Sequence, residues 1–508
     1  MAAVVTDQFR ILNANNFVDS VLDDNNSYYV FLGLPNSTAV GFGRTSDWNS
    51  SSSGPPSPVD NLQYLTHYRD TSLFGKRVTS ANIRRVIRKV EWTSNTAYDM
   101  YRHDYSILNQ TPNSQTSRLY DSNYYVINSD YRVYICIDNG SSGTNLKGER
   151  SRYEPTSTDL QPFSAGSDGY LWKYLFSISP SDVIKFDSTE YIVVPNDWDT
   201  TSDAQIQTVR ESGDSEVNDN QIKKVYIENG GAGYSAGTYN ILGDGSGARV
   251  SISVDSSGTI TSTNVVNGGS GYTYGIVDLE RTGTISNPAK LIPIIPPSKG
   301  HGYDIYTELG TDRVLIYARF DDSTKDFPVS TKFSQVGIVK NPKEYSGVST
   351  YVGSTYSSLY ALKLDSGYTG TPAVGEIVTQ TQSSTQIAKG YVASYDSTTK
   401  VLKYLKDRSL FLTNGLDQQD STDITIDSNI VEFNNTDSIS FTSATSTSVS
   451  AGFTGSSENG IDLGVTFTGG LANPEINKKT GDIIYIDNRP QVERNLRQKE
   501  DVKIILEF

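Results

Sequence analysis

Only a few residues of this chain have the types and spacing that an enzyme would need. His301 and Asp304 lie close together in the sequence and could form an acid–base pair. Neither a nucleophile nor a third group that could orient the histidine stands beside them. A structural loop is therefore the favoured interpretation of this segment, and acid–base chemistry is the alternative.

Neighbouring carboxylates are the second feature that could do chemistry. Asp321 with Asp322, or Asp482 with Asp487, could serve as the two acids of a glycosidase, which must be held at a defined separation. A chain with 58 acidic residues contains many such pairs by chance. The sequence does not give the separation of any pair, so chance pairing is the simpler explanation. We therefore expect no enzymatic activity and keep a glycosidase as a minor alternative.

Soft metal ligands are scarce. The single cysteine, Cys136, lies in the apolar run 134–137, which predicts a buried strand thiol rather than a nucleophile. One cysteine excludes an internal disulfide and is typical of a protein made in a reducing cytoplasm. The three histidines, His67, His103 and His301, are far apart in the sequence. We therefore expect no metal site and no cofactor.

Two glycine-rich copies form an internal repeat. Residues 227–234 read Ile-Glu-Asn-Gly-Gly-Ala-Gly-Tyr, and residues 265–272 read Val-Val-Asn-Gly-Gly-Ser-Gly-Tyr. A phosphate-binding loop would end in Lys-Ser or Lys-Thr, and a calcium loop would carry regularly spaced acids; neither pattern is present. The glycines are better explained as positive-φ turns at strand ends. We predict a small inserted β module over 218–285.

Composition and charge narrow the class of protein. The net charge of −15 argues against a general binder of nucleic acid or of an anionic membrane. No stretch approaches the roughly 20 apolar residues of a membrane span, and the first residues lack a signal-peptide pattern. With 42 glycines and 33 tyrosines, the 508 residues predict a mainly β protein, of α+β type, with multi-layer sheets and short helices in its loops.

An aromatic stretch near the middle of the N-terminal half is the strongest strand signal. Gly166–Gly169 forms a turn, after which Tyr170, Trp172 and Tyr174 alternate with other residues. A β-branched run, 190–195, follows. We predict two buried strands joined by a loop.

Other periodic segments complete the expected architecture. A helix is predicted from Thr6 or Asp7 to about Leu22. A second helix is predicted over 80–92, where Ile83, Val86, Ile87 and Val90 recur at helical spacing and Arg84, Arg85, Arg88 and Lys89 take the other side. That basic face could meet an acidic partner or phosphate, although a solvated face with local ion pairs is favoured. Strands are predicted at 28–33, 124–127, 131–137, 313–320, 374–380, 389–395, 400–405, 481–490 and 502–508.

Several of these segments resemble one family. The runs Gly-Tyr-Leu-Trp-Lys-Tyr-Leu-Phe at 169–176 and Glu-Tyr-Ile-Val-Val-Pro at 190–195 resemble the dimeric baseplate wedge subunit of T-even-type contractile-tailed phages. Phe-Gly-Arg-Thr-Ser-Asp-Trp at 42–48, the strand ending in Asn-Pro at 333–342, and the Asp-Asn-Arg-Pro turn at 487–490 are similar to the same family. Arg88 stands where the family usually has proline.

The resemblance implies a fold, partners and a location. It implies a multi-layer β-sandwich, a homodimer, and a structural place in the baseplate wedge of the virion, assembled in the host cytoplasm. Its partners would be other wedge proteins, with pin or fibre proteins as further contacts. The expected segments are scaffold at 1–217, 286–343 and 471–508, with inserted β modules at 218–285 and 344–470. Family-matched interface candidates are Arg44, Trp48, Arg489 and Pro490.

A receptor-binding or carbohydrate-binding tail protein is the main alternative function. Many tyrosines and Gly/Ser-rich loops could present stacking surfaces for sugars. The two inserted modules are where such binding would be sought.

Overall fold

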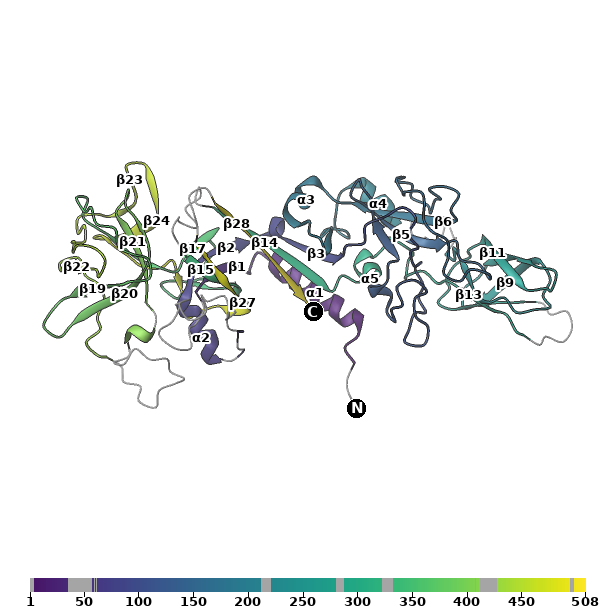
Figure 1. Ribbon diagram of the computed structural model, residues 1–508, viewed down its shortest axis with the longest axis horizontal. Coiled ribbons are helices and arrows are strands. Elements are labelled where there is room, and N and C mark those ends of the chain that lie inside the picture. The colour runs from purple at the N-terminus through teal and green to yellow at the C-terminus, as the bar shows by residue number, and fades with distance from the viewer. Residues whose placement is uncertain are drawn as a thin grey trace. The chain divides into compact units, whose positions relative to one another are not determined.

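A computed structural model describes most of the chain (Figure 1). The described residues are 4–34, 57, 58, 60, 62–211, 221–279, 287–321, 332–406, 408–411, 427–493 and 498–508. They divide into two compact units. Unit 1 comprises 1–16, 84–315 and 505–508, and unit 2 comprises 17–83 and 316–504. Antiparallel sheets with a few short helices make up both units, so the predicted mainly β class is confirmed.

The aromatic stretch forms an edge strand, β6, of a three-stranded sheet in unit 1. Strands β4 (Tyr125–Ile127), β5 (Arg132–Asn139) and β6 (Tyr170–Ser177) make an antiparallel sheet in which Cys136 faces Trp172. The rings of Tyr170 and Trp172 stack with their centroids 5.3 Å apart, and both are buried. Alternation of large aromatic side chains thus places one face of β6 in the core, and the predicted strand is confirmed.

The connection after β6 differs from the predicted loop. It contains the helix α3 (Pro180–Phe186) before the chain enters β7 (Tyr191–Val194). Ser179 caps this helix by accepting a hydrogen bond from the Asp182 amide, and proline occupies its first turn. β7 lies in another sheet from β6. The two predicted strands exist, but they are not partners.

The predicted helix over 80–92 is wrong. Ser80–Asn82 forms one 3-10 turn, and β3 (Ile83–Arg88) follows as a strand that pairs with β7. Both faces of β3 are largely buried, so apolar residues occur on each and their spacing imitates that of a helix. Arg85 is itself buried, with its guanidinium 4.3 Å from the centre of the Tyr306 ring. β-branched side chains suit the extended backbone better than a helix.

The glycine-rich segment forms its own sheets within unit 1. The order β11-β10-β9-β12 describes one, and β13 pairs with β8 in another. The bounds are β8 (Val225–Asn229), β9 (Gly237–Gly243), β10 (Arg249–Val254), β11 (Ile260–Asn267), β12 (Gly275–Val277) and β13 (Lys290–Pro293). Inward side chains such as Ile241, Val250 and Ile252 form a separate buried cluster.

The two repeat copies adopt the same turn. In the first, Asn229 Oδ1 accepts a hydrogen bond of 3.0 Å from the amide of Gly231, whose φ is 63°. In the second, Asn267 Oδ1 accepts one of 2.9 Å from Gly269, whose φ is 61°. A positive φ favours glycine at each position. The interpretation of the repeat as turn chemistry is confirmed.

Lowering the pH should destabilise the glycine-rich segment, because Asp244 becomes protonated. Hydrogen bonds from the Thr273 hydroxyl and then the Thr273 amide lower the pKa of Asp244 from 3.8 to about 2. A carboxyl with a depressed pKa stabilises the fold above its ordinary pKa, and that contribution is lost as the pH falls from about 4 to about 2. In a carbon-13 NMR titration, Thr273→Val should move the pKa of Asp244 towards 3.8. Asp255, whose pKa is lowered mainly by Ser257, is the control and should not move.

Two larger sheets build unit 2. The first has the order β17-β2-β1-β15-β27, and the second the order β22-β19-β20-β21-β18-β25. The bounds in the first are β1 (Tyr28–Gly33), β2 (Ser72–Val78), β15 (Lys332–Lys340), β17 (Thr355–Ser357) and β27 (Asp482–Glu493). In the second they are β18 (Tyr360–Lys363), β19 (Ile377–Thr381), β20 (Ile387–Asp396), β21 (Val401–Leu405), β22 (Ile439–Ser440) and β25 (Leu471–Ala472). The strands predicted in these ranges are confirmed.

The described residues contain further helices and strands. They are α1 (Asp7–Leu22), α2 (Leu62–Thr71), α4 (Ala204–Glu211), α5 (Ile305–Leu309), β14 (Arg313–Asp321), β16 (Lys343–Glu344), β23 (Gly455–Glu458), β24 (Ile461–Phe467), β26 (Ile476–Asn477) and β28 (Lys499–Glu507). The predicted N-terminal helix is α1. Within the described ranges, no helix has both the length and the apolar character needed to cross a membrane. The boundaries expected for two inserted modules stay predictions.

Candidate functional site

His301 and Asp304 have structural partners. Asp304 caps α5, because its Oδ1 accepts hydrogen bonds from the amides of Tyr306 at 3.1 Å and Thr307 at 3.2 Å. His301 Nδ1 lies 2.6 Å from Oε1 of Glu308. The sequence analysis missed Glu308, although its place one helical turn after the capping aspartate was a usable signal.

The His301–Glu308 pair is closed off from solvent. Glu308 is 2% exposed, and its second oxygen accepts a 2.7 Å hydrogen bond from the Gly302 amide. The His301 ring meets Tyr101 edge-on at 4.8 Å. Burial and then the charge of Glu308 raise the pKa of Tyr101. This arrangement ties the 301–304 loop to α5 and keeps both His301 and Glu308 buried, so the structural interpretation is favoured.

One member of each candidate carboxylate pair contacts a cation. Asp321 forms an ion pair with Lys499, whose Nζ lies 2.8 Å from Oδ2 of the aspartate. Asp487 forms an ion pair with Arg489. Asp322 lies outside the described residues. Asp482 is exposed at the start of β27. No described contact joins Asp482 to Asp487 as a working pair of acids.

The other candidate ligands are dispersed or buried. Cys136 is fully buried in β5, as predicted, and burial raises the pKa of its thiol. His103 Nδ1 accepts a hydrogen bond from the Ile295 amide at 3.2 Å. The side chain of His67 is outside the described part of the chain. Among the described residues, no three His, Cys, Asp or Glu side chains gather as a metal site would require.

The basic residues of β3 and its end make local contacts. Arg84 pairs with Asp182 at 2.9 Å, and Lys89 pairs with Asp187 at 3.1 Å. Arg88 donates to the Ser122 carbonyl at 2.8 Å. These contacts agree with the favoured interpretation of the basic residues, which was local ion pairs rather than a basic docking face.

Two of the four interface candidates can be placed. Arg44 and Trp48 lie outside the described residues. Arg489 and Pro490 are exposed on β27, at the edge of its sheet. They fall within a register shift, between the pairs Gln335↔Asn488 and Phe333↔Val492. A bulge on an edge strand tolerates proline, which has no N–H to donate to the ladder. Their role as contacts stays a prediction.

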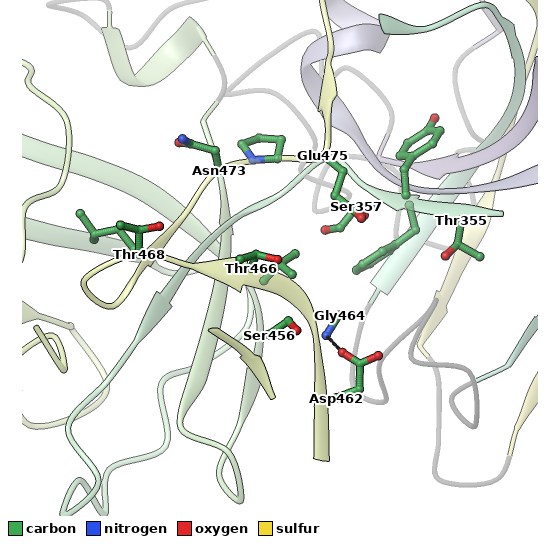
Figure 2. Close-up of a pocket in the computed structure, with 14 residues that line it drawn as sticks. Thr355, Ser357, Ser456, Asp462, Gly464, Thr466, Thr468, Asn473 and Glu475 are labelled. Carbon is green, nitrogen blue, oxygen red and sulfur yellow. Dashed lines mark hydrogen bonds between the residues drawn. The ribbon is translucent and has the colours of Figure 1, made fainter. Parts of the chain in front are cut away.

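A polar pocket of about 750 Å³ opens within unit 2 (Figure 2). Its walls come from β24, from β17 and from the segment leading to β26. The lining residues are Phe74, Thr355, Tyr356, Ser357, Ser456, Asp462, Gly464, Val465, Thr466, Thr468, Leu471, Asn473, Pro474 and Glu475. The sequence analysis did not anticipate this pocket.

Two carboxylates set the electrostatics of the pocket. Asp462 Oδ1 accepts a hydrogen bond of 2.9 Å from the Gly464 amide, as Figure 2 shows. Glu475 accepts one of 2.6 Å from the Ser357 amide and one of 3.2 Å from the Tyr351 hydroxyl. Burial raises the pKa of Glu475. No Lys, Arg or His is among the lining residues.

Comparison with known proteins gives an informative similarity. No protein-family model matches the chain. Over 219 residues the chain is 26% identical to "Baseplate wedge protein gp8" of Enterobacteria phage T4. The alignment covers 38% of this chain and 60% of that protein, so the chain spans less than two thirds of its relative. The chain is thus similar, over part of its length, to a structural protein of a phage baseplate.

Proposed function

We propose that this chain is a structural subunit of the tail baseplate wedge in a contractile-tailed phage. The observation that carries the proposal is the similarity to a baseplate wedge protein over 219 residues. The mainly β architecture supports it, as does the structural use of the described residues that could have done chemistry, His301 and Cys136. The subunit holds neighbouring wedge proteins together during assembly and transmits the signal for sheath contraction.

The proposal includes a homodimer and two insertions. Each chain pairs with a second copy and contacts other wedge proteins, with fibre or pin proteins at the periphery. Segments 218–285 and 344–470 are insertions into the wedge scaffold. The separate buried clusters formed by Ile241 with its neighbours and by Leu402 with its neighbours support two self-contained modules.

Electron microscopy of intact tails tests the location. An antibody fragment against 344–470 should add density at the baseplate, in pairs repeated around the six-fold axis. Density confined to fibre tips would contradict the wedge assignment and favour a receptor-binding protein.

Arg489 offers a test of the contact surface. Its exposed side chain on an edge strand can reach a partner without supporting the core. Arg489→Ala should reduce the yield of assembled wedges about tenfold or more, in line with loss of an arginine hot spot, while the melting temperature of the free chain stays unchanged. Arg319→Ala is the matched control, because Arg319 is also an exposed strand arginine paired with an aspartate. Equal yields for both variants would exclude Arg489 from the interface.

A further inference from the structure

One face of β24 lines the pocket. Leu463, Val465 and Phe467 point into a buried cluster, so the alternation of the strand turns Asp462, Gly464 and Thr466 the other way. Figure 2 shows Asp462, Gly464 and Thr466 along one strand, with Ser357 and Thr355 across from them. The core packing of β24 therefore presents a row of polar groups to the pocket.

Many hydrogen-bonding groups in this pocket have no partner. Among the residues that the structure describes, the side chains of Thr355, Ser456, Thr466 and Asn473 make no hydrogen bond. Asp462 uses one oxygen for the Gly464 amide and keeps the other available. Hydroxyls and an amide both donate and accept, so these groups match a ligand whose own groups do the same. A sugar hydroxyl has that property.

The charge of the lining selects against other ligands. Two carboxylates and no cationic side chain would repel phosphate, sulfate or an acidic peptide. A calcium ion prefers six to eight oxygen ligands with several carboxylates, and no group of three acids gathers among the described residues. Carboxylates accept strong hydrogen bonds from neutral hydroxyls, which leaves a polyol as the best match.

The apolar lining residues and the size of the pocket agree with this ligand class. Leu471 and Pro474 contribute apolar surface beside the polar wall, and sugars combine hydroxyl edges with apolar C–H faces. A volume of about 750 Å³ lies within the usual range for small-ligand sites.

We propose that this pocket of unit 2 binds a neutral glycan, with Asp462 and Asn473 as its main hydrogen-bonding side chains. The site goes beyond the wedge role. It would let a baseplate protein hold a neutral saccharide of the host cell surface, and its failure would leave the wedge assignment intact.

Binding by the full-length chain tests the site. An array of neutral bacterial and plant oligosaccharides identifies the best ligand, and isothermal titration calorimetry then measures its Kd. Asp462→Ala and Asn473→Ala should each weaken binding at least tenfold, because each removes a direct hydrogen bond and leaves a ligand hydroxyl unpaired. The melting temperatures of both variants should stay close to that of the parent.

Asp365 provides the matched control. Like Asp462, it is exposed and accepts a hydrogen bond, of 2.8 Å, from the amide of a glycine two residues on, but it does not line the pocket. Asp365→Ala should leave glycan affinity unchanged. The proposal is overturned if no neutral glycan binds at millimolar concentration, if the Asp462 and Asn473 variants bind as well as the parent, or if the pocket takes calcium or a lysine-rich peptide instead.

Discussion

Replacement of Glu308 by alanine should lower the free energy of unfolding of unit 1 by about 3–5 kcal/mol. The carboxylate is completely buried and serves two partners, His301 at 2.6 Å and the Gly302 amide at 2.7 Å. Its removal leaves a buried imidazole and a buried N–H without acceptors, and each unpaired group carries its full desolvation cost. Denaturant unfolding followed by circular dichroism measures the change.

A second variant separates the hydrogen bonds from the packing. Glu308→Gln keeps an oxygen that can accept from the Gly302 amide, so it should cost less than half as much as alanine. A double-mutant cycle with His301→Ala should give a coupling energy of about 1 kcal/mol or more, because the two side chains share one contact. A cost of less than about 1 kcal/mol for Glu308→Ala would mean that the buried pair does not form.

The second large effect is expected at Trp172. Its ring is fully buried, stacks on Tyr170 and meets Tyr98 edge-on at 6.0 Å. Trp172→Ala removes the largest side chain from the centre of β6, and the resulting cavity should cost about 3–5 kcal/mol. Thermal and urea unfolding of the full chain would detect it.

Phenylalanine substitutions at two tryptophans add a sharper comparison. Trp198 Nε1 donates to the carbonyls of Gly302 at 3.1 Å and Tyr303 at 3.2 Å, whereas Trp172 Nε1 is buried and has no partner among the described residues. Trp198→Phe should therefore be more destabilising than Trp172→Phe by about 1–3 kcal/mol. The reverse order would contradict the hydrogen bonding described for Trp198.

Every strand predicted from an individual segment overlaps a strand of the structure. Tyr170, Trp172 and Tyr174 alternate along β6, and each is buried in the structure, because the period of a strand can be read from a single segment. The Asn-Gly-Gly turns were also predictable, since Asn229 and Asn267 act on residues two positions away. Short-range chemistry is visible in the sequence.

The failures have a common physical origin. Arg85 looked like part of a solvated helix face, yet tertiary packing buries it against Tyr306, more than 200 positions away. No pattern near residues 80–92 of the sequence indicates that Tyr306 packs against Arg85. Burial on both sides of β3 removes the polar and apolar alternation on which the identification of a strand depends.

The candidate pocket could not be predicted from the sequence for the same reason. It brings Thr355 on β17 together with Asp462 on β24 and with Glu475, and no local motif links these positions. Sequence does record that Asp462, Gly464 and Thr466 alternate with larger apolar residues. It does not record what stands opposite them. By contrast, Glu308 follows Asp304 within one short helix and could have been named as a partner for His301.

Strand β1 must wait during synthesis for one of its two neighbours, because the chain of unit 1 interrupts that of unit 2. Strand β1 lies between β2 and β15 in its sheet, but 84–315 must leave the ribosome before β15 does. At about 5–20 residues per second, the edge of β1 waits roughly ten to fifty seconds for its second neighbour. All six residues of β1 are buried in the finished structure, so its side-chain faces are largely apolar, and its unpaired backbone N–H and C=O groups are open to wrong pairings in the meantime. We expect the nascent chain to need a chaperone during that interval, while the uninterrupted stretch 84–315 of unit 1 can already fold.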